Sequence, residues 1–546
     1  MKSENTKSST SCQNEQGEVM VLDRAISVSD VLRATARATP QRSAVVDEAG
    51  SLTYREFDET VDRLAAGLQR LGIGAGDRVA YLLWNQRELL LSYFSIARLG
   101  ALTVSLNFRL TAEELAYQLS AAKCKALIVD EELAGLASQA IATSTLSIRL
   151  IVCGSGVGPD QLRFDDLLSA TTDMSSFPIV SSDADSGIWF TSGTTGRPKG
   201  AVVKHRSALA AAMLGAWAIR ISEPIRVLGV APLFHRGAME NVALPVVMCG
   251  GTQFLFKKLN AAQTLEYLEK LEINTAFIVP TMAWQLLREL TAETKPLPHL
   301  VNWLSASAPL PPVLAEQITK RFELPNGVMN TYGITEMLFV STCPPSMLSR
   351  KPGSAGLPAP GTQIAIYDDK RGVLPRGEIG EILISGPTAF SRYLDNEQAT
   401  RDAIIDLNGQ EWYRSGDVGV LDEDGYLAIK DRKKDMIISG GENVYCAEVE
   451  LALIDHPSIR EVAVVGVPDE KWGEIVVAAI VKATDAAVDM DDIVRSCASL
   501  ASYKRPREVV CLDALPRNSF GKVRKDLVRE MVRERLPSST RIRRAS

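Results

Sequence analysis

Apolar residues recur along the first part of the chain at helical and strand spacings in turn. One set recurs every three to four residues and predicts an amphipathic helix; it comprises Phe57, Val61, Leu64, Leu68 and Leu71. Short apolar runs then alternate with further helical patterns, and these segments cover 78–83, 89–98, 102–106, 113–122 and 126–129. Strands that alternate with helices indicate layers built on parallel sheets.

The second half of the chain has a different pattern. Proline and glycine cluster between residues 344 and 361. Short β-rich segments joined by turn residues follow at 363–367, 378–385 and 419–429,. A charged segment, 431–435, then precedes the last compact part of the chain.

Beyond the charged segment, the pattern predicts a helix over 447–454 and strands over 462–467 and 476–481,. At 546 residues the chain is too long for a single hydrophobic core,. We therefore predict an α/β protein with a large N-terminal domain, made of layered α/β subdomains and a β-rich subdomain, and a small α+β C-terminal domain on a hinge. The predicted divisions are a polar tail (1–25), the large domain (26–431), the hinge (432–436), the small domain (437–530) and a basic tail (531–546).

Composition narrows the classes of protein that the chain can be. Its 66 acidic and 60 basic residues give a net charge of −6, which argues against a nucleic-acid binder,. Eight cysteines without a C-x-x-C pair and only four histidines argue against a disulfide framework or a structural zinc site,. Because the sequence has no signal-peptide pattern and no long apolar run, we expect a cytoplasmic protein without a transmembrane segment.

The strongest chemical signal is the segment 191–200, TSGTTGRPKG, which follows a predicted strand over 187–190. Its glycines allow backbone N–H groups to curl around an anion, its hydroxyls add donors, and Lys199 adds a positive charge for phosphate. It is not a Walker P-loop, because no G-K-[ST] closes it. A flexible Ser/Gly/Thr linker is the alternative, and the order of hydroxyls, glycines and terminal lysine argues against it.

This segment resembles the phosphate loop of the adenylate-forming superfamily. The superfamily includes acyl-CoA synthetases, aryl-CoA ligases, peptide-synthetase adenylation domains and firefly-type luciferases, and the chain looks most like fatty-acyl-CoA synthetases. The resemblance extends over about residues 26–529. It implies an acid–thiol ligase that uses ATP and Mg²⁺ to activate a carboxylic acid as acyl-AMP. The acyl group would then pass to CoA, with release of AMP and pyrophosphate.

A second motif, 330–336, reads NTYGITE and resembles the N-x-Y-G-x-T-E signature of the superfamily. Tyr332 offers a flat face for adenine, and Gly333 lets the base come close. By resemblance, Thr335 bonds a phosphoryl oxygen. Glu336 would hold Mg²⁺, a hard ion that prefers carboxylate and phosphate oxygens.

A third motif, 412–417, reads WYRSGD and resembles Y-x-T-G-D with Ser415 in place of threonine. By resemblance, Asp417 accepts hydrogen bonds from the ribose hydroxyls, and Thr191 joins Glu336 as a metal ligand. The residues that the resemblance assigns to ATP are Thr191, Ser192, Gly193, Thr194, Thr195, Gly196, Lys199, Asn330, Thr331, Tyr332, Gly333, Thr335, Asp417, Arg432 and Lys522.

The segment 431–450 resembles the crossover motif of acyl-CoA synthetases. Lys434 occupies the hinge position of that motif. Gly440 and Gly441 would line the pantetheine tunnel once the small domain has turned. Cys446 stands where the family usually has proline, which we expect to have a modest local effect.

Two further segments complete the resemblance. Residues 231–235, APLFH, resemble a segment whose histidine borders the carboxylate pocket, and residues 516–522, PRNSFGK, resemble the motif that ends in the catalytic lysine. An isolated lysine would more often be a solvated surface residue, so its role rests on the motif. The predicted catalytic residues are Lys522, Lys199, His235 and Glu336.

The acid-binding pocket is expected to be apolar. By position in the family, its lining residues are His235, Met239, Val279, Ser307, Met337, Leu338 and Phe339. We therefore favour a fatty or alicyclic acid over a small aryl acid. No basic residue is clearly placed to pair with a second carboxylate, although Arg236 leaves that pairing open.

The residues leave several alternatives open. The acyl acceptor could be an acyl-carrier protein or an amine in place of CoA, although the full crossover motif favours CoA. An aryl-CoA ligase remains possible, and so does a homodimer. A catalytically silent relative is disfavoured because the charged motif residues are intact. A dinucleotide oxidoreductase is excluded, because no predicted strand is followed by G-x-G-x-x-G.

Overall fold

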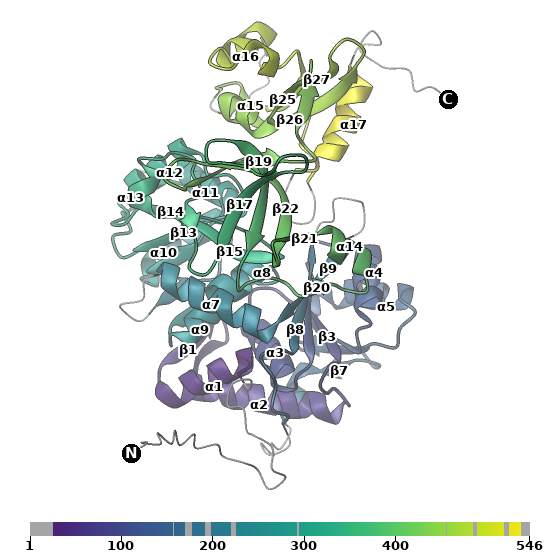
Figure 1. Ribbon diagram of the computed structural model, residues 1–546. Coiled ribbons are helices and arrows are strands. Elements are labelled where there is room, and N and C mark those ends of the chain that lie inside the picture. The colour runs from purple at the N-terminus through teal and green to yellow at the C-terminus, as the bar shows by residue number, and fades with distance from the viewer. Residues whose placement is uncertain are drawn as a thin grey trace, which may run out of the picture.

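The computed structural model describes residues 26–156, 158–169, 177–191, 198–219, 225–291, 294–454, 456–483, 489–517 and 523–536. Two α/β layers form the lower part of the large domain, and a β-rich subdomain lies between them and the small domain (Figure 1). The predicted α/β class, with a large and a small domain, is confirmed. Among the described helices, none is both long and apolar enough to cross a membrane.

The first sheet contains the strands that flank the predicted phosphate loop. Its strand order is β20-β9-β8-β4-β3-β5-β6-β7, and its pairs are parallel except where β9 meets β8 and β20. Its strands are β3 (Arg78–Leu82), β4 (Leu102–Ser105), β5 (Ala126–Asp130), β6 (Arg149–Cys153), β7 (Leu162–Arg163), β8 (Asp185–Thr191), β9 (Lys199–Lys204) and β20 (Arg392–Tyr393). Its helices are α2 (Tyr54–Arg70), α3 (Arg87–Arg98), α4 (Ala112–Ala122), α5 (Ala134–Thr143) and α6 (Phe164–Leu168).

The second sheet carries the NTYGITE motif at one end. Its order is β16-β15-β14-β13-β12-β10-β11-β1-β2. Its strands are β1 (Ser43–Asp47), β2 (Gly50–Thr53), β10 (Arg226–Leu228), β11 (Thr252–Phe254), β12 (Thr275–Phe277), β13 (Asn302–Ser305), β14 (Val328–Ile334), β15 (Met337–Cys343) and β16 (Leu357–Pro358). The helices of this layer are α1 (Val28–Ala38), α7 (His205–Ile219), α8 (Arg236–Ala238), a π-helix (Met239–Ala243), α9 (Leu244–Met248), α10 (Ala261–Lys270), α11 (Pro280–Arg288), α12 (Pro312–Arg321) and α13 (Pro345–Leu348).

Local chemistry explains why the predicted elements form. Thr53 and Glu56 make a reciprocal capping box that begins α2, and Gly72, at φ +76°, follows its end,. In β3, Val79 packs with the α2 and α3 side of the sheet, whereas Ala80 packs with the α4 and α5 side. A strand buried on both faces reads as a continuous apolar run. The helices and strands predicted between residues 57 and 129 are therefore confirmed, with ends shifted by at most a few residues.

The β-rich subdomain has the strand order β18-β17-β19-β22-β21. Strand β23 pairs with the second half of β22, beyond the part that pairs with β21. Its elements are β17 (Gln363–Asp368), β18 (Gly372–Val373), β19 (Ile379–Ser385), α14 (Glu397–Asp402), β21 (Ile404–Leu407), β22 (Gln410–Leu421) and β23 (Leu427–Arg432). The predicted β-segment over 419–429 spans the end of one strand, a turn and the start of the next. Gly425, at φ +86°, forms that turn.

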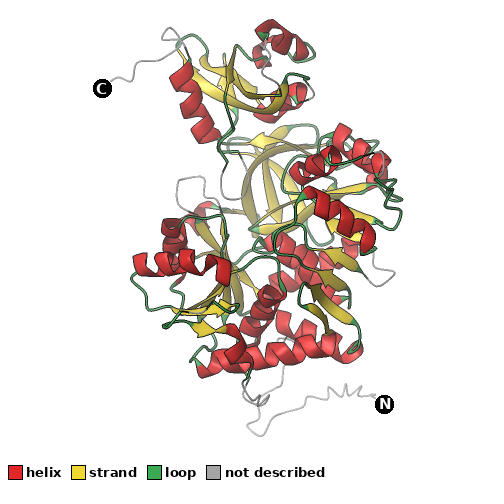
Figure 2. Ribbon diagram, turned by 180° about the vertical axis from the view of Figure 1, so that it is seen from behind, coloured by secondary structure: helices red, strands yellow, loops and turns green. Residues whose placement is uncertain are grey.

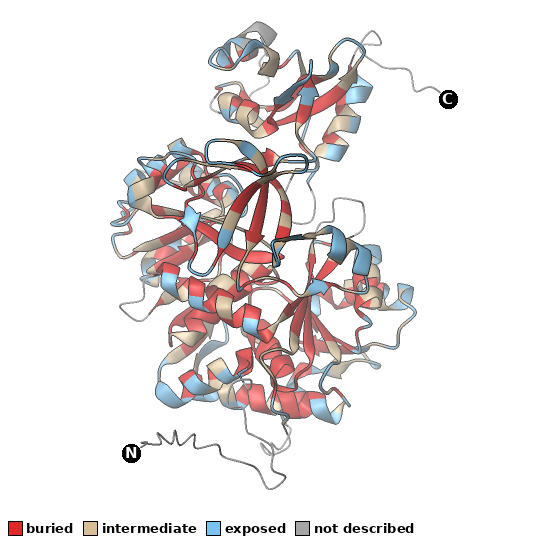
Figure 3. Cartoon of the chain, viewed as in Figure 1, coloured by how far each residue is buried: buried red, intermediate tan, exposed pale blue. Residues whose placement is uncertain are grey.

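The small domain packs helices against a mostly antiparallel sheet. Its elements are β24 (Ile437–Ser439), β25 (Glu442–Val444), α15 (Cys446–Leu453), β26 (Ile459–Asp469), β27 (Gly473–Lys482), α16 (Met490–Ser496), β28 (Glu508–Cys511) and α17 (Lys525–Arg535). The predicted helix and strands of this region are confirmed. Seen from behind, helices cover the outer faces of the large domain's sheets (Figure 2). The strands between them are largely buried (Figure 3).

A buried histidine at the start of α7 predicts a loss of stability in acid. His205 is 0% exposed, its Nδ1 accepts the Val28 N–H, and burial lowers its pKa from 6.5 to about 4, although Asp30 and Asp185 act in the opposite direction. Between pH 6.5 and 4 the unfolded chain therefore binds a proton that the folded chain does not, so stability falls as the pH falls. We expect wild type to lose about 2 kcal/mol more than His205→Gln between pH 7 and pH 5. Urea unfolding at both pH values measures this, and equal losses would contradict it.

Candidate active site

Glu336 lies in the turn between β14 and β15 and is held from both its side chain and its backbone. The residue is 8% exposed, and its Oε1 accepts the Tyr393 hydroxyl at 2.6 Å. The Tyr393 hydroxyl also lies 3.2 Å from that of Tyr413. The Glu336 carbonyl accepts the Phe390 N–H at 2.7 Å. The carboxylate predicted to hold Mg²⁺ is therefore fixed in position.

Lys199 is the first residue of β9 and lies beside the same tyrosine. Because β20 pairs with β9, Tyr393 is opposite Ala201, and Lys199 Nζ lies 5.1 Å from the centroid of the Tyr393 ring. A cation over an aromatic face is attracted to it. Tyr393 thus contacts Lys199 with its ring and Glu336 with its hydroxyl. Tyr393 could not be predicted from the sequence, because only the β9–β20 pairing brings it next to Lys199.

Replacing Tyr393 with phenylalanine should weaken the response to Mg²⁺. The ring and its contact with Lys199 remain, but Glu336 loses the hydroxyl that orients it. Groups that orient a metal ligand are typically worth 10- to 100-fold, so we expect the half-saturating Mg²⁺ concentration for ATP–pyrophosphate exchange to rise about tenfold. Tyr54→Phe is the control, because Tyr54 is a buried tyrosine that donates to Gly251 far from Glu336. An unchanged Mg²⁺ response in Tyr393→Phe would refute the role.

Strands β8 and β9 hold the two ends of the phosphate loop together. Thr191 pairs with Lys199 across the sheet, and its Oγ1 donates to the Lys199 carbonyl at 3.4 Å. The Tyr117 hydroxyl, from α4, donates to the Pro198 carbonyl at 3.1 Å. The intervening residues assigned to ATP lie outside the described part of the chain; they are Ser192, Gly193, Thr194, Thr195 and Gly196.

Asp417 is the centre of a second cluster. It is 5% exposed, its Oδ2 accepts the Tyr332 hydroxyl at 2.6 Å, and its Oδ1 pairs with Arg432 Nε at 2.6 Å. Burial and the neighbouring Asp417 charge raise the pKa of Tyr332 well above its usual value. Ser415 accepts the Asp417 N–H and donates to the Ile382 carbonyl. The hydroxyl at the usual threonine position therefore holds this part of β22 against β19. The structure thus brings three predicted nucleotide-binding residues together.

Other residues of the NTYGITE motif have structural contacts. The side-chain amide of Asn330 donates to the Ser354 carbonyl at 2.8 Å, and Thr331 Oγ1 donates to the carbonyl at the end of β13 at 3.4 Å. A Cβ at Gly333 would lie 3.0 Å from the Phe339 backbone nitrogen. The close approach of β14 and β15 therefore favours glycine at this position.

His235 immediately precedes α8 and is neutral at physiological pH. Burial, helped by the nearby positive charge of Arg109, lowers its pKa from 6.5 to about 3. Its ring lies 4.3 Å from that of Phe234. Four of the other residues predicted to line the pocket are buried, namely Met239, Met337, Leu338 and Phe339. Val279 is partly buried, and Ser307 is exposed at φ +72°.

Arg236 is not available to pair with a second carboxylate of a substrate. Its side chain is fully buried and its Nε pairs with Glu240 Oε2 at 2.7 Å. Its terminal nitrogens donate to the carbonyls of Thr335 at 2.6 Å and Thr388 at 3.1 Å. The possible pairing of Arg236 with a second substrate carboxylate is therefore wrong, because its guanidinium already bonds a carboxylate and two carbonyls of the protein.

The charged segment between the domains leads from β23 to β24. Arg432 ends β23, and Lys434 is exposed in the turn that follows. Gly440 and Gly441, at φ +62° and +84°, form the two-residue turn between β24 and β25, which requires glycine-like backbone conformations. The Gly440 N–H donates to the Trp472 carbonyl at 2.7 Å. This turn is the part of the small domain that the resemblance assigns to pantetheine.

Cys446 fills the usual proline position without disturbing the helix that follows. It is the first residue of α15, it is buried, and its Sγ lies 3.0 Å from the Asp435 carbonyl. The Ala447 N–H lies 3.4 Å from Asp431 Oδ2. Both contacts hold the segment between the domains against the start of α15.

Lys522 lies outside the described residues, but the chain on either side of it is placed. Arg517 and Val523, which flank the undescribed residues, form an isolated antiparallel bridge. The pKa of Arg524 is raised by its bond to Asp526 and, more weakly, by Glu114 on α4 of the large domain. The role of Lys522 therefore stays a prediction that rests on its motif.

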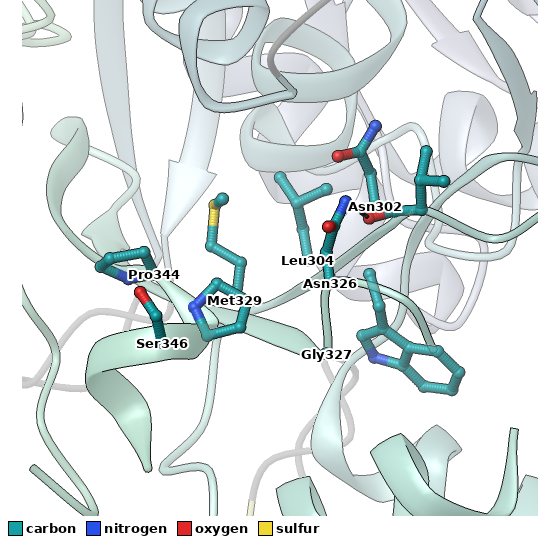
Figure 4. A pocket seen from close by; sticks show the side chains of 10 residues that line it. Asn302, Leu304, Asn326, Gly327, Met329, Pro344 and Ser346 are labelled. Atoms are coloured by element: carbon teal, nitrogen blue, oxygen red, sulfur yellow. Dashed lines mark hydrogen bonds between the residues drawn. The ribbon is translucent and has the colours of Figure 1, made fainter. Parts of the chain in front are cut away.

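A cavity of about 150 Å³ lies elsewhere in the second layer (Figure 4). It is lined by residues that include Asn302, Asn326 and Met329. Asn302 is the first residue of β13 and marks the amino end of that strand. The NTYGITE motif instead extends from opposite the last residue of β13 to beyond the carboxyl end of β14, the neighbouring parallel strand. Because ligands of open α/β sheets bind at the carboxyl ends of strands, this cavity is not part of the candidate site.

The described residues fit a magnesium ion that is bound mainly by nucleotide phosphates. Among them, no cluster of three His, Cys, Asp or Glu side chains could hold a metal. Magnesium in nucleotide sites needs only one or two protein carboxylates, with phosphates and water completing its shell. Glu336 supplies a buried carboxylate whose Oε1 is oriented by Tyr393, and Thr191 ends β8 opposite Lys199, which contacts the same tyrosine.

The chain matches known proteins over most of its length. The family described as AMP-binding enzyme matches residues 32–394, and the AMP-binding enzyme C-terminal domain matches residues 448–522. An indoleacetate–CoA ligase of Aromatoleum aromaticum is 34% identical over 90% of this chain and 96% of its own. A long-chain-fatty-acid–CoA ligase of Mycobacterium tuberculosis is 35% identical over 93% and 99%. The o-succinylbenzoate CoA synthetase of Bacillus subtilis, solved with its acyl-adenylate, is 29% identical, covers 94% and 99%, and superimposes with a TM-score of 0.81.

The fold and the two charged clusters define an adenylate-forming ligase that uses ATP. The chain belongs to the AMP-binding enzyme family and is an AMP-forming acid–thiol ligase. ATP and CoA are the co-substrates of that class.

Proposed function

We propose that this chain joins a hydrophobic monocarboxylic acid, fatty or alicyclic, to CoA through an acyl-AMP intermediate. The observation that carries the proposal is the convergence of strands from three sheets. Lys199 and Glu336 both contact Tyr393, and Tyr332, from the same motif as Glu336, bonds Asp417, which pairs with Arg432. The kinship with CoA ligases supports CoA as the acceptor.

The first half-reaction joins two anions. A carboxylate oxygen of the acid attacks the α-phosphorus of ATP, and the bond to pyrophosphate breaks. The barrier is mainly electrostatic repulsion and positioning, so positive charge aimed at the phosphoryl group lowers it. Lys199 and Arg432 are the described residues that supply this charge. Mg²⁺, when bound through Glu336, would neutralise phosphate oxygens further.

The second half-reaction uses the same site after the small domain has turned. The thiol of CoA loses its proton, its sulfur attacks the acyl carbonyl, and AMP leaves. The turn of Gly440 and Gly441 would then face the large domain in place of the motif that ends in Lys522. One active site thus serves two reactions through motion at a single hinge.

Several side chains support an apolar acid with one carboxylate. His235 is neutral, Arg236 is committed to Glu240, and Met239 and Met337 are buried. Apolar pockets discriminate weakly between chain lengths, by about 1–3 kcal/mol per methylene. An aryl-acetic acid is the second candidate, because a relative of similar identity is an indoleacetate–CoA ligase.

The deciding experiment is pyrophosphate release from ATP and Mg²⁺ with a panel of fatty, alicyclic and aryl acids, with and without CoA. Products are identified by mass. Acid-dependent release that yields acyl-CoA, fastest with fatty or alicyclic acids, supports the proposal. Acyl-AMP that accumulates despite CoA would refute CoA as acceptor and favour a carrier protein or an amine. Fastest turnover with an aryl acid would replace the proposed acid.

A further inference from the structure

A buried ion pair follows the predicted pocket histidine. Arg236 begins α8 and Glu240 lies one turn later in the π-helix, with Nε and Oε2 2.7 Å apart and both side chains 0% exposed. Burying two charges costs several kcal/mol, which their attraction alone does not reliably offset. A short π-helix is also uncommon and often marks a functional site. The pair therefore requires an explanation beyond stability.

The remaining nitrogens of Arg236 connect two segments that both contact Glu336. One donates to the carbonyl of Thr335, the residue directly before Glu336, at 2.6 Å. The other donates to the carbonyl of Thr388 at 3.1 Å. Thr388 Oγ1 in turn donates to the Leu338 carbonyl at 2.6 Å, so the segments on both sides of the carboxylate are tied together.

The segment that contains Thr388 leads directly to the partners of Glu336. The Phe390 N–H donates to the Glu336 carbonyl at 2.7 Å, and the Tyr393 hydroxyl donates to its carboxylate at 2.6 Å. The guanidinium of Arg236 thus joins the turn that carries Glu336 to the segment that orients it. Its planar fork suits this task, because it reaches several acceptors in a fixed geometry that lysine does not reproduce.

We propose that Arg236, held by Glu240, is a positioning residue that sets the place of the Glu336 carboxylate for Mg²⁺ and the ATP phosphates. The inference rests on the proposed function, because the role of Glu336 is assigned there. Arg236 also links α8, the helix that follows His235, to the turn that carries Glu336. The acid pocket and the phosphate site therefore share one buried side chain.

The chain contains a matched control for this role. Arg98 is also buried, at 5% exposed, and forms ion pairs with Asp58 at 2.6 Å and Asp62 at 2.5 Å. Its Nε donates to Ser29 Oγ at 2.9 Å. These contacts join α1, α2 and α3 on the far side of the first layer from Glu336. Arg98→Lys therefore perturbs a comparable buried arginine without touching the candidate site.

The test compares Arg236→Lys with Arg98→Lys and wild type. The readouts are Mn²⁺ affinity in the presence of ATP, followed by electron paramagnetic resonance, ATP–pyrophosphate exchange, and thioester formation from supplied acyl-AMP. For Arg236→Lys we expect Mn²⁺ affinity and exchange to fall about 10- to 100-fold, and thioester formation to change less than about threefold. Arg98→Lys should lower the melting temperature and leave all three readouts unchanged.

A second variant covers the case in which lysine disrupts the fold. Arg236→Met combined with Glu240→Met removes both charges, so no buried charge is left unpaired, and it should show the same selective losses. Unchanged Mn²⁺ affinity in the variants, or equal losses in both half-reactions, would overturn the positioning role of Arg236. The proposed function would still stand if wild type showed acid-dependent exchange. Absence of acid-dependent exchange in wild type would overturn both.

Discussion

Replacing Lys522 with alanine should reduce acyl-AMP formation by about 10²–10³-fold, the usual cost of removing one charge or donor aimed at a transition state. In the resemblance, this lysine meets the acid carboxylate and the α-phosphate during adenylation. Once the small domain has turned, Lys522 would no longer be at the site. Thioester formation from supplied acyl-AMP should therefore stay near the wild-type rate.

The two half-reactions are measured separately, as ATP–pyrophosphate exchange and as conversion of synthetic acyl-AMP and CoA to acyl-CoA. Arg533→Ala is the control, because it removes one exposed positive charge from α17 of the same domain. It should leave both rates unchanged. Equal losses of both half-reactions in Lys522→Ala would refute the assignment.

The layered part of the fold could be predicted because local signals agree with the tertiary structure. In α2 the apolar spacing, the Thr53–Glu56 capping box and the glycine after its end all indicate the same helix,. The sheet orders could not be predicted, because they depend on pairings between distant segments. The pairing of β20 with β9 is an example, since it joins the β-rich part of the chain back to the first sheet.

The candidate site could be predicted where the residues lie in a motif. Tyr332, Asp417 and Arg432 were assigned by resemblance, and they meet within hydrogen-bonding distance. Tyr393 and Glu240 were missed because neither stands in a recognised motif. The sequence left open whether Arg236 pairs with a substrate carboxylate, and the structure pairs it with Glu240 instead. An arginine in a pocket segment gives no sign of whether its charge faces a ligand or a buried carboxylate four residues later.

Several glycines of the motifs have a backbone reason to be glycine in addition to the ligand contact predicted for them. Gly333 was expected to make room for adenine, yet its Cβ would first meet the backbone of β15. Gly440 and Gly441 were expected to line a tunnel, and their positive φ angles already require glycine in the turn. Motif residues in this chain thus build the backbone that presents the site, in addition to any contact with a ligand.

Replacing Lys434 with proline should block the second half-reaction and leave the first. The exposed side chain of Lys434 has no ion pair among the described residues, so its loss alone should matter little. Its neighbours are held, because the Lys433 N–H donates to the Gly416 carbonyl and the Asp435 N–H donates to the Arg432 carbonyl. A domain rotation at this position therefore has to come from the backbone dihedrals of residue 434. Proline fixes φ near −65° and removes that freedom.

We expect thioester formation from supplied acyl-AMP to fall by about 10²-fold in Lys434→Pro, because the small domain cannot bring its second face to the site. Exchange of pyrophosphate with ATP should change much less. Lys434→Ala separates the backbone from the side chain, since it removes the charge and keeps φ free; both of its rates should match wild type. A normal second half-reaction in the proline variant would show that the domains turn elsewhere. A loss in the alanine variant equal to that in the proline variant would assign the effect to the lysine side chain instead of the hinge.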